Sequence, residues 1–131
     1  MPDYQPLPRP NDALLALRPA IAGQPAPLPT PATVADFQQQ VLRPLLKLQH
    51  SLLAALLEDF ALDYRLPAPT ANPVEAARHR ADLLARNTRL RATLVGAVAG
   101  LLTAPELAFY RQHRPELNRR LLDMLAVRLG K

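Results

Sequence analysis

Residues 33–64, TVADFQQQVLRPLLKLQHSLLAALLEDFALDY, contain the longest apolar run in the chain. Projected as an α-helix at about 100° per residue, this run has one broad apolar face and a narrow polar side. A single neighbouring helix cannot cover so broad a face, so we expect the rest of the chain, or a second copy of it, to pack around this segment. The apolar face comprises Val34, Val41, Leu45, Leu48, Leu52, Leu53, Leu56 and Phe60, and the opposite side carries Lys47, Ser51 and Glu58.

The composition favours an all-α fold. The chain has 131 residues, enough for one domain with its own core. Leucine and alanine supply most of the 49% of apolar residues, and both favour helix over sheet. The absence of cysteine excludes disulfides, thiol nucleophiles and cysteine-ligated metals. No stretch approaches the roughly 20 apolar residues of a membrane-spanning helix, and no signal-peptide pattern is present, so we expect a soluble, cytoplasmic protein.

Capping residues predict where three long helical segments begin. In each case a side chain that can cap a helix is followed three positions later by an acidic residue. Proline at the first or second helical position supports the second and third starts. The three pairs are Thr33 with Asp36, Asn72 with Glu75, and Thr103 with Glu106.

Two prolines are expected to interrupt these segments. Pro44 lacks an amide proton and clashes with the preceding turn, which predicts a kink or break near residues 42–43. Pro115 predicts the same at residues 113–114, whereas the helix over 73–102 is expected to be continuous. We therefore predict an up-down bundle of three long helical segments over residues 32–131, preceded by a proline-rich arm, residues 1–31.

The arm contains nine of the fifteen prolines but also a short apolar segment. Asn11 and Asp12 are expected to cap a helical turn over residues 13–17, which Pro19 ends. Four apolar side chains in this region have no core of their own, so we expect them to anchor the arm. The arm lies either across its own bundle or on a neighbouring subunit. The anchors are Leu14, Leu15, Leu17 and Ile21.

Polar residues interrupt the predicted apolar faces. Gln49 lies near the centre of the first face and Asn87 near the centre of the second. In an antiparallel pair that turns near residue 68 these positions are level, so each amide is expected to bond the other. Arg91, one turn beyond Asn87, is expected to pair with Glu116. We predict a buried polar layer of these four residues, which either fixes the helix register or lines a pocket for a small polar ligand.

No catalytic or cofactor motif is present in the sequence: we find no Gly-rich phosphate loop, nucleophile elbow, zinc-protease motif or calcium loop. His50, His79 and His113 fall on separate segments at different levels, too far apart to share a metal ion. We therefore expect no cofactor, no metal site and no catalytic residues. The acidic end of the first helix is expected to face a basic cluster in an ion-pair lattice, Glu58, Asp59 and Asp63 opposite Arg78, His79 and Arg80.

The chain is basic, with 16 Lys and Arg against 11 Asp and Glu. Fourteen of the sixteen are arginine, which reflects either a GC-rich genome or phosphate binding. Several are expected to pair with acids one turn away along their helices: Arg78–Asp82–Arg86, Glu116–Arg120 and Arg119–Asp123. From residue 84 onward, five basic residues are left over and are predicted to form a phosphate-facing basic patch: Arg89, Arg111, Arg114, Arg128 and Lys131.

These observations predict a non-catalytic helical protein of interaction or assembly, either a homo-oligomer or one subunit of a larger complex. It would act by burying apolar helix faces, with the arm as an anchor. The alternative is a basic helical protein that binds nucleic acid, although the sequence has no recognition-helix, zinc-finger or RNA-binding motif.

Overall fold

The structure, a computed structural model, describes residues 7–21, 32–66 and 72–130. Within these ranges the secondary structure is helical and contains no strand, so the predicted all-α class is confirmed. The elements, in chain order, are α1 Asn11–Ala16, α2 Val34–Phe37, the π-helical turn η1 Gln38–Leu42, α3 Arg43–Asp63, α4 Pro73–Arg86, α5 Thr88–Ala99, α6 Ala104–Gln112 and α7 Arg114–Leu129.

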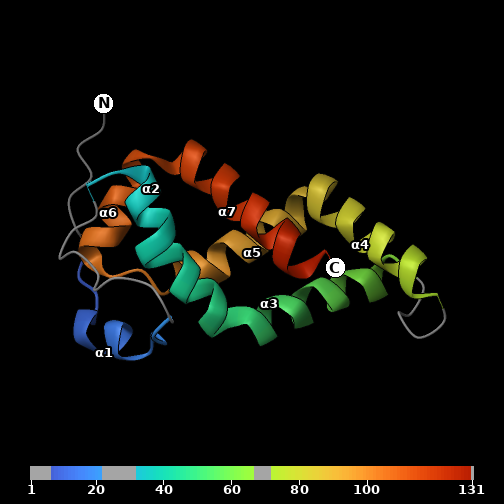
Figure 1. Cartoon of the computed structure of the whole chain (residues 1–131), viewed down its shortest axis with the longest axis horizontal. Helices are drawn as coiled ribbons and strands as arrows, with labels where there is room; N and C mark the ends of the chain where they lie inside the picture. Colours follow the sequence, from blue (N-terminus) through green and yellow to red (C-terminus); the bar gives the residue numbers. More distant parts are fainter. Residues whose placement is uncertain (1–6, 22–31, 67–71, 131) are drawn as a thin grey trace.

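The helices form an elongated bundle (Figure 1). Helices α3 and α4 meet at one end, and α1, α2 and α6 gather at the other. Along the middle, α5 packs on α3, and α7 packs on α4, α5 and η1. The core lies between these helices and is built mainly of leucine, including Leu45, Leu53, Leu90, Leu94, Leu117 and Leu125.

The first long segment begins as predicted and then widens into a π-helical turn. The Thr33 hydroxyl accepts a hydrogen bond from the Asp36 amide at 3.1 Å. Five residues, Gln38–Leu42, follow in π geometry before α3 begins. In an α-helix the Pro44 ring would collide with the carbonyl of residue 40, and a wider turn relieves this clash. The irregularity predicted near residues 42–43 takes the form of this turn.

The π turn changes which side chains face the core. It holds more residues per turn than an α-helix, so residues on either side of it do not follow one straight projection. Leu52, predicted on the apolar face, is 45% exposed, whereas its neighbour Leu53 is fully buried. Leu46 and Leu57, which the projection did not select, are buried instead. The buried stripe is therefore rotated from the predicted one.

The predicted continuous helix over 73–102 is wrong. Asn72 caps α4 through a hydrogen bond from the Glu75 amide, but α4 ends at Arg86 and α5 begins at Thr88. Asn87 separates them in an extended conformation, with φ −80° and ψ 106°. The break lets α5 turn across α3 while α4 stays against α7.

The third segment is also two helices, as Pro115 predicts. Thr103 and Glu106 form the expected capping box at the start of α6. Residue His113 then separates α6 from α7. Its ring stacks on Phe109 with centroids 4.3 Å apart, and Phe109 stacks on Phe37 at 5.2 Å. This aromatic stack links the break between α6 and α7 to α2, which carries Phe37.

Candidate interaction site

The described part of the N-terminal arm, residues 7–21, is held to the turn between α5 and α6 by two arginines. Arg9 donates from Nε to the Leu102 carbonyl at 3.3 Å and from Nη2 to the Gly100 carbonyl at 2.5 Å. Arg18 donates from Nη2 to the Leu101 carbonyl at 3.4 Å. These three carbonyls belong to the turn that follows α5, whose own last carbonyls already accept the amides of Gly100, Leu101 and Leu102. The arm therefore supplies hydrogen-bond donors to the turn between α5 and α6 and places positive charge near the negative end of the α5 dipole.

The arm also contacts the start of α6. Arg18 forms a two-pronged ion pair with Glu106, with its Nη1 2.6 Å from Oε2. The Ala104 amide donates to the Asn11 side-chain oxygen at 2.8 Å. Asn11 was expected to cap its own helical turn, but α1 has Pro10 at that position with no side-chain bond, and Asn11 caps α6 instead. We call these contacts of Arg9, Asn11 and Arg18 the arm clasp.

Glu106 is the centre of the clasp. It is buried, and its Oε1 also accepts the Thr103 amide at 2.9 Å. Burial alone would raise the pKa of Glu106, but the hydrogen bonds from Arg18 and Thr103 outweigh it and lower the pKa below its usual value. The carboxylate is therefore ionised at neutral pH, and the ion pair with Arg18 is a charged one.

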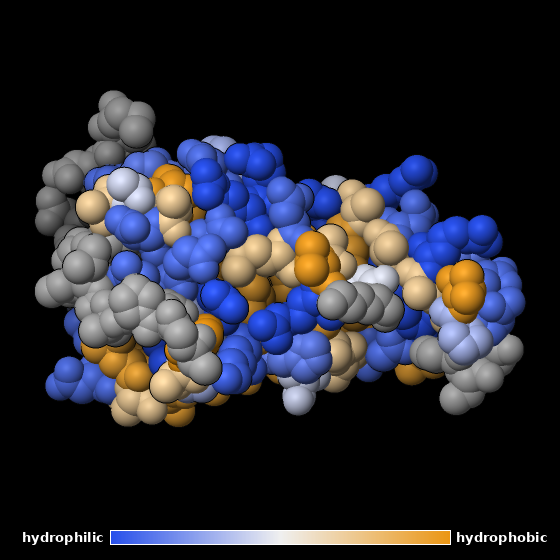
Figure 2. Space-filling view, in the orientation of Figure 1, coloured by the Kyte–Doolittle hydropathy of each residue, from blue (hydrophilic) through white to orange (hydrophobic). Residues whose placement is uncertain are grey.

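The four predicted arm anchors divide into buried and exposed side chains. Leu14 is 7% exposed and Ile21 is half-buried, so these two do pack on the chain itself. Leu15 and Leu17 are 50% and 54% exposed and do not. Leu7 is similarly exposed. Figure 2 shows orange and tan surface gathered over the α1 end of the molecule. The clasp fixes the arm while leaving apolar side chains in solvent.

The predicted polar layer does not form, and its members have other partners. Gln49 Nε2 donates to the Ala97 carbonyl of α5 at 3.1 Å, so Ala97 rather than Asn87 is level with it. The Asn87 side-chain oxygen accepts the Leu90 amide at 2.9 Å and caps α5. The break at Asn87 changes the register on which the layer depended.

The remaining two members of that layer are also separated. Arg91 Nη1 donates to the carbonyls of Leu84 and Ala85, at 3.1 and 2.9 Å, and so closes the end of α4. Glu116 bonds Arg120 at 3.1 Å, which is the intrahelical pair that its spacing predicts. Asn87 and Arg91 together bond backbone groups at the break between α4 and α5: the amide of Leu90 and the carbonyls of Leu84 and Ala85. The sequence could have indicated the cap at Asn87, because Asn followed by Thr and an apolar run is typical of a helix start.

The acidic end of α3 and the basic start of α4 meet through the pair of Glu58 and Arg80. Arg80 is buried and donates from Nε and Nη2 to both oxygens of Glu58, each at 2.6 Å. These bonds lower the pKa of Glu58. His79 lies 3.8 Å from Glu75 on its own helix instead. Within the described residues, the predicted lattice is therefore centred on the bidentate bridge between Arg80 and Glu58.

The basic residues of the predicted patch lie on three helices. Arg89 on α5, Arg111 on α6 and Arg114 on α7 are exposed, and Arg128 on α7 is half-buried. Lys131 lies outside the described residues. His50, His79 and His113 lie on α3, on α4 and at the α6–α7 elbow, and within the described ranges no three acidic, His or Cys side chains form a metal-binding group.

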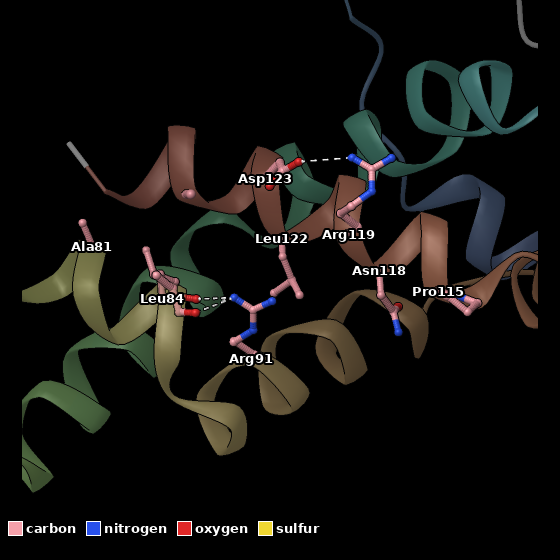
Figure 3. A pocket seen from close by; sticks show the side chains of 10 residues that line it. Ala81, Leu84, Arg91, Pro115, Asn118, Arg119, Leu122 and Asp123 are labelled. Atoms are coloured by element: carbon pink, nitrogen blue, oxygen red, sulfur yellow. Dashed lines mark hydrogen bonds and ion pairs between the residues drawn. The ribbon is translucent and has the colours of Figure 1, made fainter.

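A shallow groove runs between α4, α5 and α7 (Figure 3). Its floor is apolar, with Ala81, Leu84, Ala85, Leu122 and Ala126, and its edges carry Arg91, Asn118, Arg119 and Asp123. Asn118 accepts the Tyr110 hydroxyl at 2.5 Å. Burial raises the pKa of Tyr110, so this hydroxyl stays a donor at neutral pH.

Comparisons with known protein families, with curated proteins and with solved structures give no match for this chain. Of the helices in the described ranges, none has the length and apolarity required to span a bilayer.

Proposed function

We propose that this protein is a non-catalytic interaction or assembly module whose contact surface is the outer side of the N-terminal arm. The observation that carries the proposal is the contrast within one short segment. Polar bonds of Arg9, Asn11 and Arg18 hold the arm to the α5–α6 corner, while Leu15 and Leu17 stay half exposed.

Single exposed leucines are common on protein surfaces and need no explanation. Leu7, Leu15 and Leu17 lie within eleven consecutive positions, however, on a segment whose backbone is already fixed. Ordering them costs little further entropy, so a partner that covers them gains most of the hydrophobic free energy, about 25 cal/mol per Å² buried. Pre-organised apolar side chains of this kind suit an apolar helix face of a partner protein, whether a copy of this chain or a subunit of a larger complex. The cytoplasmic location expected from the sequence stays part of this proposal.

Light scattering over a range of protein concentrations tests the proposal. The full chain should show a mass above the 14.4 kDa of one copy, increasing with concentration. The variant L15S/L17S should shift toward a single copy, because it removes exposed apolar surface and leaves the clasp intact.

The variant L62S is the matched control, because Leu62 on α3 is also strongly exposed but lies away from the arm. It should associate as the unaltered chain does. A full chain that remains a single copy at every concentration would contradict self-assembly through the arm, and so would an L15S/L17S variant that associates normally.

Nucleic-acid binding is the second candidate, and one observation favours it. Arg89 and Arg114 are exposed and form no ion pair with a carboxylate of the described residues. Fluorescence anisotropy with duplex and single-stranded oligonucleotides at two salt concentrations tests it. Binding that weakens steeply with salt supports this candidate, and no binding at low salt removes it.

A further inference from the structure

Helix α7 presents an exposed pair of opposite charges on its outer face. Arg119 and Asp123 are one turn apart, and their side chains are 64% and 74% exposed. The atoms nearest one another, Arg119 Nη1 and Asp123 Oδ2, are 3.8 Å apart. A solvated pair at this distance holds its members only weakly, so both groups are available to another molecule.

The same two residues lie between two hollows. One is the groove against α4 and α5, about 360 Å³ in volume, with alanines along its floor (Figure 3). The other, about 340 Å³, lies toward η1 and includes Gln38, Arg120, Met124 and Val127. Helix α7 is therefore a ridge with a groove on each side. Ridges that fit into grooves are how helices pack, and small floor residues such as Ala81 and Ala126 let the backbones approach closely.

The charges on this ridge complement themselves when one copy is reversed. If two α7 helices lie antiparallel, Arg119 of one copy faces Asp123 of the other, and the reciprocal pair forms at the same time. Val127, one turn beyond Asp123 and 66% exposed, then lies opposite Pro115 of the other copy. A contact in which the same surface serves both copies is the two-fold arrangement of most homodimers.

We propose that the α7 ridge is a two-fold interface at which a second copy of this chain docks antiparallel. A uniformly acidic or uniformly basic partner would attract one of the two charges and repel the other. A second copy satisfies both, and its own ridge fills the alanine-floored groove. The proposal goes beyond the arm contact, because it uses a different helix and does not involve Leu15 or Leu17.

Charge reversal tests the ridge directly by analytical ultracentrifugation. R119D places two carboxylates on the ridge and D123R places two guanidinium groups there. Each variant alone should self-associate at least about tenfold more weakly than the unaltered chain, because like charges then face each other. Mixed in equal amounts, the two should form a one-to-one complex. The double variant R119D/D123R should regain self-association, because the pairs form again with reversed polarity.

The ion pair of Asp82 and Arg86 on α4 gives the matched control, because it has the same spacing and is also exposed. The variant D82R/R86D should leave association unchanged, and circular dichroism should show every variant folded. An unaltered chain without dimers overturns the proposal, as does a mixture of R119D and D123R that forms no complex. Dimers that survive R119D and D123R but disappear in L15S/L17S would assign association to the arm and reject the ridge. The converse result would reject the arm and support the ridge.

Discussion

Arg18 and Glu106 are 88 positions apart in the chain, yet they form a two-pronged ion pair in which each side chain is only 10% exposed. The same carboxylate accepts the Thr103 amide and so begins α6. Attachment of the arm and the start of a core helix therefore depend on one side chain. A partner that displaced the arm would leave Glu106 with its local bond alone.

Replacing Arg18 with Ala should lower the free energy of unfolding by about 3 kcal/mol, because it leaves a buried carboxylate without its partner. Replacing both groups, as in R18M/E106Q, should lower the free energy of unfolding by less than R18A does, since no unpaired buried charge remains. Urea denaturation followed by circular dichroism at pH 7 measures both. If R18A matched the unaltered chain, the clasp would not be formed in solution.

The contribution of Glu106 should decrease in acid. Its pKa is lowered in the folded chain, so its stabilisation is fully present above the unfolded pKa of about 4.3 and is lost as the pH falls through the folded value. The difference in urea midpoint between the unaltered chain and E106Q should therefore be large at pH 7 and 5 and smaller at pH 3 than at pH 5. E116Q, on an exposed pair, should show a small difference throughout. A difference for E106Q that is larger at pH 3 than at pH 7 would contradict this pH dependence.

Asn87 should behave as a helix cap and not as a buried register residue. Its side-chain oxygen accepts the Leu90 amide, so N87A and N87L should each destabilise the fold by about 1 kcal/mol. N87D and N87S should retain most of the stability, because both side chains can accept the same bond. Thermal unfolding compares the four variants. A more stable N87L would support the buried-layer interpretation instead.

Leu52 and Leu53 should differ sharply although they are neighbours. L53A should lower the free energy of unfolding by about 2–5 kcal/mol, since it opens a cavity in the core. L52A should change the free energy of unfolding by no more than about 1 kcal/mol, because the Leu52 side chain is already half exposed to solvent. Chemical denaturation of both variants tests the rotation that the π turn introduces. Equal losses of stability in the two variants would instead support the apolar face predicted from an uninterrupted α-helix.

The features predicted correctly are those that depend on residues within one helical turn of each other. Thr33, Asn72 and Thr103 cap their helices, and Pro115 marks the break before α7. The pairs Glu116–Arg120 and Arg119–Asp123 follow from four-residue spacing. Each depends on residues close together in sequence, where backbone geometry fixes the distance.

Features that depend on contacts between helices could not be derived from the sequence. From the sequence alone, Asn87 could either lie in a buried polar layer or cap a helix. Arg91 could either pair with an acidic residue on another helix or donate to the carbonyls that precede it on its own segment. Both choices depend on whether the chain bends at residue 87.

The sequence alone determined that this chain is helical, where most of its helices begin, and that the arm carries apolar side chains. The tertiary structure decided that Arg9 and Arg18 close the α5–α6 corner and that Leu15 and Leu17 stay outside. The physical reason is that caps and propensities act over a few residues. Burial and ion pairing depend instead on which distant segments meet, and a π turn or a broken helix changes that register for every residue beyond it.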